Sequence, residues 1–150
     1  MSAGTPKRML MTRALVCLAL VVALAFATTA FAVIRHFSGT VEGGGTVTFA
    51  TKFRHGKTRL VRTPVRFSDV PITCDQGNGT LDFTLSGGSL RVTRRQFAYQ
   101  TPAGNPRAKI TGTFTNKGRR AHGTFRSYGT YGSATGCDTE TVDWRAHRVP

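Results

Sequence analysis

Acidic residues are scarce in this chain of 150 residues, which carries 7 Asp and Glu against 21 Lys and Arg. The resulting formal charge of +14 disfavours cationic partners, because like charges repel. A calcium site needs about six oxygen ligands, and a glycosidase needs two carboxyl groups that flank one sugar bond. The best-spaced pair, Asp138 and Glu140, is better explained as a solvated loop beside arginines.

Motifs for metals, nucleotides and covalent catalysis are also missing. The chain has no C-x-x-C or H-x-H pair for zinc, and its glycine run at 43–45 lacks the lysine and the helix of a phosphate-binding loop. Its four histidines are scattered, and His122 has no identifiable serine or cysteine partner. We therefore expect no metal site, no cofactor and no catalytic residue, and the leading prediction is a protein that is not an enzyme.

Helical periodicity is absent after residue 33, where apolar and polar residues alternate in short runs separated by glycines. A period of two places one face of a strand in a core and the other in water. The pattern predicts an all-β fold, a single antiparallel β-sandwich or β-barrel of about eight strands. The apolar residues that alternate in this way are Val47, Phe49, Phe53, Val61, Val65, Phe67, Leu81, Phe83, Leu85, Val142, Trp144 and Ala146.

One hairpin can be placed in register, with its turn centred on Lys117-Gly118. Phe114 then faces Ala121, Gly112 faces Gly123 and Ile110 faces Phe125, and all six lie on one apolar face. A slip of one residue would mix the two faces, so the hydrophobic pattern selects this register. The facing glycines leave room for a large side chain from across the core, for which we expect Trp144.

Two segments depart from simple alternation. Leu90 and Val92 are out of phase with Phe97 and Tyr99, which predicts a β-bulge near Arg94-Arg95. Pro64 lies inside a strand pattern and lacks an N–H donor, which predicts a sheet edge or a break there.

Residues 1–32 have the pattern of a secretory signal peptide. Three cations (Lys7, Arg8 and Arg13) precede an uncharged stretch, 14–32, that ends in an A-x-A cleavage pattern. The rival interpretation is an uncleaved membrane anchor, because nineteen such residues nearly span a bilayer. Both interpretations place a single domain, 33–150, outside the cytoplasm, secreted or at the cell surface. Cleavage would leave 18 cations against the 7 acids, a formal charge of +11.

The domain that follows keeps two cysteines, Cys74 and Cys137. Two cysteines in an exported domain most often form a disulfide, and the alternative is two buried free thiols. The bridge would close a loop of about 64 residues, which the chain-entropy model values at about 4 kcal/mol.

The segments FSDVPITC (67–74), ITGTF (110–114), GRRAHGTFR (118–126) and CDTETVDWRAHR (137–148) resemble a group of exported β-rich proteins of actinobacteria. Those proteins share a GTVTF opening, a V-P-x-x-C strand end, an A-x-G-T-F hairpin and a late C-x-T…W-x-A segment. The resemblance covers about residues 39–148. It implies the β fold and the disulfide, and it implies no activity.

Basic residues are the one positive indication of function. They concentrate in three groups on the expected strands, and arginine binds phosphate and carboxylate through a planar fork of donors. The candidates for binding a polyanion are Arg54, Lys57, Arg59, Arg62, Arg66, Arg94, Arg95, Arg119, Arg120 and Arg126. Outside a cell, such a surface would contact an anionic cell-wall polymer or polysaccharide. Nucleic acid is disfavoured as a physiological partner, and a membrane is expected only if the signal segment stays uncleaved.

Three alternatives remain open from the sequence alone. The basic residues could serve solubility only, without a ligand. The chain could be an extracellular carbohydrate hydrolase that uses Asp138, Glu140 or His122, which would have to converge on one cleft. It could also be a structural module that assembles through β-edge pairing, and the sequence leaves its oligomeric state open.

Overall fold

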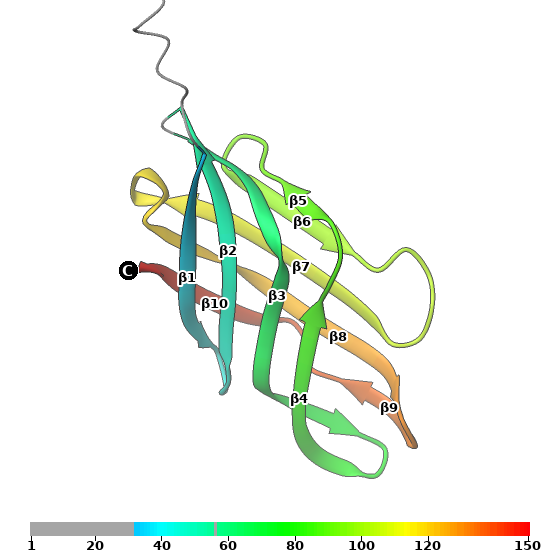
Figure 1. The fold of residues 1–150 in the computed structure, drawn as a ribbon. Coiled ribbons are helices and arrows are strands. Elements are labelled where there is room, and N and C mark those ends of the chain that lie inside the picture. The colour runs from blue at the N-terminus through cyan, green and yellow to red at the C-terminus, as the bar shows by residue number, and fades with distance from the viewer. Residues whose placement is uncertain (1–31, 56) are drawn as a thin grey trace, which may run out of the picture. The chain divides into compact units, whose positions relative to one another are not determined.

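The computed structural model describes residues 32–55 and 57–150, and the predicted signal peptide therefore lies almost wholly outside the described residues (Figure 1). The described chain is all-β, which confirms the predicted fold class, and it forms ten antiparallel strands rather than about eight. No helix in this part of the chain is both long and apolar enough to span a membrane. The strands are β1 (Val33–Val41), β2 (Thr46–Arg54), β3 (Lys57–Cys74), β4 (Gly77–Leu85), β5 (Ser89–Arg91), β6 (Gln96–Gln100), β7 (Arg107–Thr115), β8 (Arg120–Tyr131), β9 (Ala134–Asp138) and β10 (Val142–Val149).

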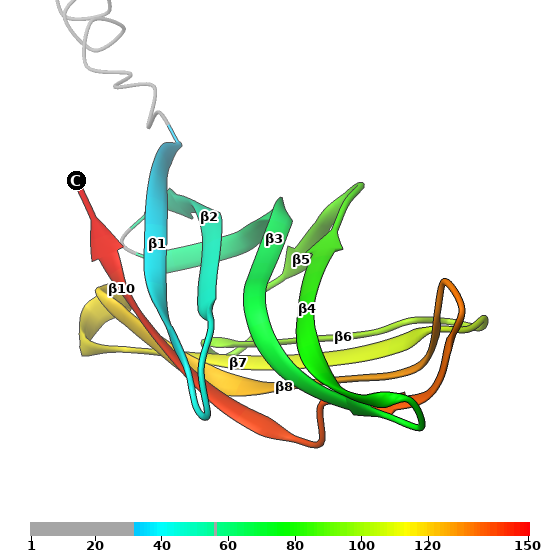
Figure 2. The same ribbon diagram turned by 90° about the horizontal axis from the view of Figure 1, so that it is seen from below.

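Six of these strands close into a barrel, in the order β1-β2-β3-β9-β8-β10 and back to β1. The structure therefore selects the barrel from the two predicted architectures. β4 and β5 extend the sheet from β3, while β7 and then β6 extend it from β8. Seen from below, β6, β7 and β8 form one layer, and the curved strands β1 to β4 rise from it (Figure 2).

The inner faces of the strands form one apolar core, as the alternation predicts. Trp144 is 1% exposed and lies edge-on to Phe49 and Phe67, while Phe67 stacks on Phe125. All twelve residues that the period-two pattern selects are buried or half-buried, and the intervening arginines are exposed. The hydrophobic period therefore assigned the strand faces correctly.

The predicted hairpin is confirmed residue by residue. β7 and β8 pair Phe114 with Ala121, Gly112 with Gly123, and Ile110 with Phe125. A short 3-10 turn, Asn116–Gly118, connects the two strands. The room at Gly112 is filled mainly by Phe97 on β6, which the prediction missed: a Cβ atom added to Gly112 would overlap the Phe97 ring, and it would come within 2.9 Å of the Cζ2 atom of Trp144.

The other two local predictions have different outcomes. No bulge occurs at Arg94-Arg95: both residues have left-handed φ angles, 51° and 69°, and the chain reverses there in a tight turn between β5 and β6. The shift in the alternation pattern therefore marks the step from β5 to β6, and the prediction of a β-bulge was wrong. At Pro64 the strand itself continues, since β3 runs from Lys57 to Cys74, and the predicted break is limited to the pairing, where β2 and β3 shift register between Thr48 and Ala50 of β2.

A disulfide joins Cys74 at the end of β3 to Cys137 on β9, as predicted. β9 pairs with β3 through one residue pair only, Thr73 with Asp138. Backbone N–H of Asp75 donates to the Thr135 carbonyl at 3.0 Å in the same place. The disulfide therefore closes the barrel covalently at the place where only one residue pair joins two neighbouring strands.

Candidate anion-binding site

Charge is separated along the barrel. The three turns β2–β3, β5–β6 and β7–β8 lie together at one end, at the upper left of Figure 1, and we call this the basic end. The β1–β2, β3–β4 and β8–β9 turns lie toward the opposite end. All carboxylates of the sequence belong to the β1–β2 turn, the β3–β4 hairpin and the β9–β10 segment; they are Glu42, Asp69, Asp75, Asp82, Asp138, Glu140 and Asp143. A side chain at the basic end therefore has cationic neighbours.

A pocket of about 690 Å³ opens at the basic end, and we call it the cation pocket. Its wall comes from strands β2, β3 and β7 and from the β5–β6 and β7–β8 turns. The N–H of Val92 donates to the Arg59 carbonyl at 2.9 Å, and the N–H of Phe114 donates to the Arg95 carbonyl at 2.8 Å, so backbone hydrogen bonds hold the turns together. No carboxylate lines the pocket, and its cations are Lys57, Arg59, Arg94, Arg95 and Lys117.

Four non-glycine residues at the basic end have a backbone conformation that favours glycine. His55, Arg94, Arg95 and Lys117 all have left-handed φ angles, between 49° and 69°. Glycine and asparagine adopt this conformation most easily, and other residues lose about 1 kcal/mol or more in it. A two-residue turn such as Arg94-Arg95 is best suited by Asn-Gly. Strain of this kind is common at functional sites, and the basic end holds four of the six non-glycine residues of the described chain that have left-handed φ angles.

Three more arginines crowd beside the pocket. The guanidinium of Arg35 lies 3.3 Å from the ring centre of Phe53, and this ring also lines the pocket. Burial, followed by the positive charges of Arg148 and Arg119, lowers the pKa of Arg35. Arginine nevertheless stays charged, so the basic end holds like charges close together. An anion bound here would relieve that repulsion.

The structure sorts the predicted binding cations into three sets. Lys57, Arg59, Arg94 and Arg95 line the cation pocket, while Arg54 is the last residue of β2 and Arg119 lies in the β7–β8 turn at the same end. Arg62 and Arg66 point outward in the middle of β3, and Arg120 lies on the outer wall. The prediction of basic strand faces missed Arg35 and Arg148, which reach this end only because β1 starts and β10 finishes there.

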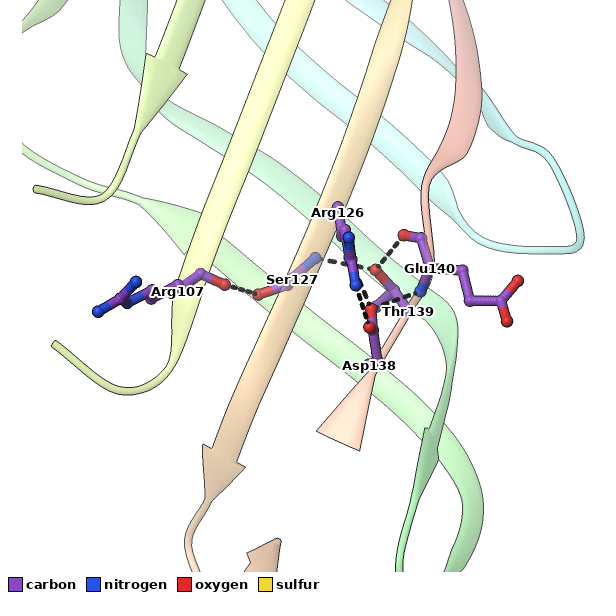
Figure 3. A network of polar contacts seen from close by, with 6 residues as sticks. All are labelled: Arg107, Arg126, Ser127, Asp138, Thr139 and Glu140. Carbon is purple, nitrogen blue, oxygen red and sulfur yellow. Dashed lines mark hydrogen bonds and ion pairs between the residues drawn. The ribbon is translucent and has the colours of Figure 1, made fainter. Parts of the chain in front are cut away.

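Arg126, the last of the predicted cations, is bound to a carboxylate (Figure 3). Its Nε and Nη2 atoms donate to the two oxygens of Asp138 at 3.1 and 2.5 Å. The hydrogen bonds from Arg126 lower the pKa of Asp138. Asp138 also accepts from the N–H of Glu140 at 2.8 Å, and the hydroxyl of Thr139 accepts from the N–H of Ser127 at 2.9 Å. Arg126 thus fastens the β9–β10 segment to β8.

Within this segment, Glu140 has a left-handed φ of 56°. We expect Glu140→Gly to raise the free energy of unfolding by about 0.5 kcal/mol, because glycine adopts this φ without a Cβ clash and keeps the N–H that Asp138 accepts. Urea denaturation of the variant measures this change. Glu140→Ala is the control, since it removes the same charge but keeps the strain; equal stability of the two variants would contradict the prediction.

The hydrolase alternative needs His122 to converge with Asp138 or Glu140, and the structure keeps them apart. Asp138 pairs with Tyr128, which lies six residues from His122 along β8, or about 20 Å. His122 lines a hollow of about 800 Å³ on the outer wall together with Asp143, and it pairs with Arg145 on β10. The described residues contain no cluster of three or more His, Cys, Asp or Glu side chains that could hold a metal ion.

The chain matches no model of a known protein family, no curated protein and no solved structure. The resemblance to exported actinobacterial β-rich proteins therefore stays a prediction.

Proposed function

We propose that this protein is an exported, non-catalytic binding domain whose basic end contacts an anionic polymer of the cell wall or an acidic polysaccharide. One observation carries the proposal: the start of β3 and two turns bring five cations around one pocket that no carboxylate of the described residues lines. Three of these five, Arg94, Arg95 and Lys117, occupy left-handed positions that cost the fold free energy. A sequence that needed only solubility could place its charges at unstrained positions.

Two features support export. The pattern of residues 1–32 is that of a secretory signal, and the Cys74–Cys137 disulfide is compatible with an oxidising compartment. Anionic polymers are available to an extracellular protein, and their binding through arginine and lysine is sensitive to salt. The resemblance to exported β-rich proteins points to the same location.

Chromatography on heparin tests the proposal with a charge-deleted variant. We expect the wild-type domain to be retained at low salt and the triple variant Arg94→Asn, Arg95→Gly, Lys117→Asn to elute at clearly lower salt. The substitutions suit the left-handed turns, so we also expect the variant to be at least as stable as the wild type. Weaker binding together with unchanged or higher stability separates binding from folding.

A matched control removes three exposed cations elsewhere, with Arg107→Gln, Lys109→Gln and Arg145→Gln. It has the same net charge as the triple variant, and we expect it to elute close to the wild type. If both variants lose the same retention, binding follows the total charge and the basic end is not a site. Elution of the wild type in the void volume at low salt would reject the proposal altogether.

A further inference from the structure

The floor of the cation pocket is apolar, although its rim is charged. Phe53, Val92 and Phe114 line it together with the five cations. Phe114 is 2% exposed and belongs to the core, where it lies edge-on to Phe49 at a centroid distance of 6.3 Å. A flat polyanion would contact the charged rim only and would leave the half-buried side chains of Phe53 and Val92 uncovered. The pocket therefore fits a ligand that is both anionic and apolar.

A buried polar atom in the wall adds a second requirement. Thr58 lines the pocket, and its Oγ1 atom is buried without a hydrogen-bond partner among the described residues. Leaving such a hydroxyl unpaired costs about 1–3 kcal/mol. A Cβ atom at Gly118 would approach this oxygen to 3.1 Å, so the absence of a side chain at Gly118 leaves space beside it. Because the oxygen itself is buried, it would pair with an oxygen atom of an anionic head group only after the Thr58 side chain rotates.

The size of the pocket is that of a site for a small molecule. Its volume of about 690 Å³ falls within the range of about 300–1,000 Å³ that is typical of ligand sites, which are mostly apolar with a few placed polar groups. Its walls come from β2, β3, β7 and the β5–β6 turn, which backbone hydrogen bonds connect. The site is thus formed before a ligand arrives.

We infer that the cation pocket binds an amphipathic anion, a molecule with one phosphate, sulfate or carboxylate head and an acyl or aromatic body. The head lies among Lys57, Arg59, Arg94, Arg95 and Lys117, and the body covers the half-buried side chains of Phe53 and Val92. This inference rests on the proposed function, and it names the ligand class of the same site. An anionic polymer that carries apolar substituents would present the same chemistry.

Calorimetric titration with butyl, hexyl and octyl phosphate, each below its micellar concentration, tests the inference on the wild-type domain. We expect the affinity to rise along the series, with octyl phosphate at least ten-fold tighter than inorganic phosphate. Ten-fold equals about 1.4 kcal/mol, which burial of about two methylene groups supplies. Octyl glucoside, which has the same body without a charge, is expected to bind at least ten-fold more weakly than octyl phosphate.

The triple variant Arg94→Asn, Arg95→Gly, Lys117→Asn should lose at least ten-fold in affinity for octyl phosphate, while the control variant Arg107→Gln, Lys109→Gln, Arg145→Gln keeps it. Equal affinities for inorganic, butyl and octyl phosphate would overturn the inference, even if retention on heparin persisted. Loss of heparin retention with an intact chain-length series would instead reject the polymer and leave a small-molecule site. Sedimentation with phosphatidylglycerol vesicles shows whether the ligand is taken from a lipid surface or free in solution.

Discussion

Gly123→Ala is expected to destabilise the domain by about 3 kcal/mol or more. Gly123 lies on β8 directly opposite Gly112, and a Cβ atom there would overlap the carbonyl oxygen of Thr111 and come within 2.7 Å of the Cα atom of Gly112. These are backbone atoms of a paired strand, and they cannot move without breaking the β7–β8 ladder. Overpacking of this kind costs about 1–3 kcal/mol even where only side chains must shift.

Gly79→Ala is the matched control for this prediction. Gly79 also lies in a strand, β4, and has no left-handed φ, but a Cβ atom there has nothing within 4 Å. Alanine should therefore leave the stability unchanged or raise it by about 0.5–1 kcal/mol. Thermal and urea unfolding of both variants give the comparison, and a loss of less than about 1 kcal/mol for Gly123→Ala would show that the two strands are less closely paired than described.

Replacement of both Cys74 and Cys137 by serine should lower the free energy of unfolding by about 4 kcal/mol. The two residues are 63 positions apart, and opening a loop of this length restores that much conformational freedom to the unfolded chain. The loss should appear first in β9, because its only pairing with β3 is Thr73 with Asp138. Amide hydrogen exchange should show β9 opening before β7 and β8, which share nine residue pairs.

Intact mass before and after reduction provides the control, since a disulfide carries two fewer hydrogen atoms, about 2 Da, than two thiols. The single variants Cys74→Ser and Cys137→Ser should each be as unstable as the double variant. If the double variant unfolds at the same urea concentration as the wild type, the hydrogen bonds between Asp75, Gln76 and Thr135 hold the seam without the bridge.

Much of the fold can be predicted from the sequence, because strand faces and hairpins are local properties. Alternation assigned the inner positions of the strands, and matching apolar positions across one short turn fixed the register of Phe114 with Ala121. The same local reasoning failed at Arg94-Arg95, because a bulge and a tight turn both change the phase of the pattern. Arginine at two left-handed positions gives no turn signal of its own.

The candidate site was only half predictable. Lys57, Arg59, Arg94 and Arg95 stand out as cations, but the pattern placed them on outward strand faces. The structure places them around one pocket at the ends of strands. Nothing in the sequence pairs Phe53 with Arg95 or Lys117, since these residues are far apart along the chain and meet only in the cation pocket.

The sequence by itself determined the strand faces, the β7–β8 register and the disulfide partners, since each depends on alternation, on one turn or on having only two cysteines in the domain. The tertiary structure alone decided that the sheet closes into a barrel, through the pairings of β1 with β10 and of β3 with β9. Closure gathers the alternate turns at each end, and this collects cations at one end and carboxylates toward the other. Which turns meet depends on contacts between strands that are distant in sequence, and a periodic pattern does not encode such contacts.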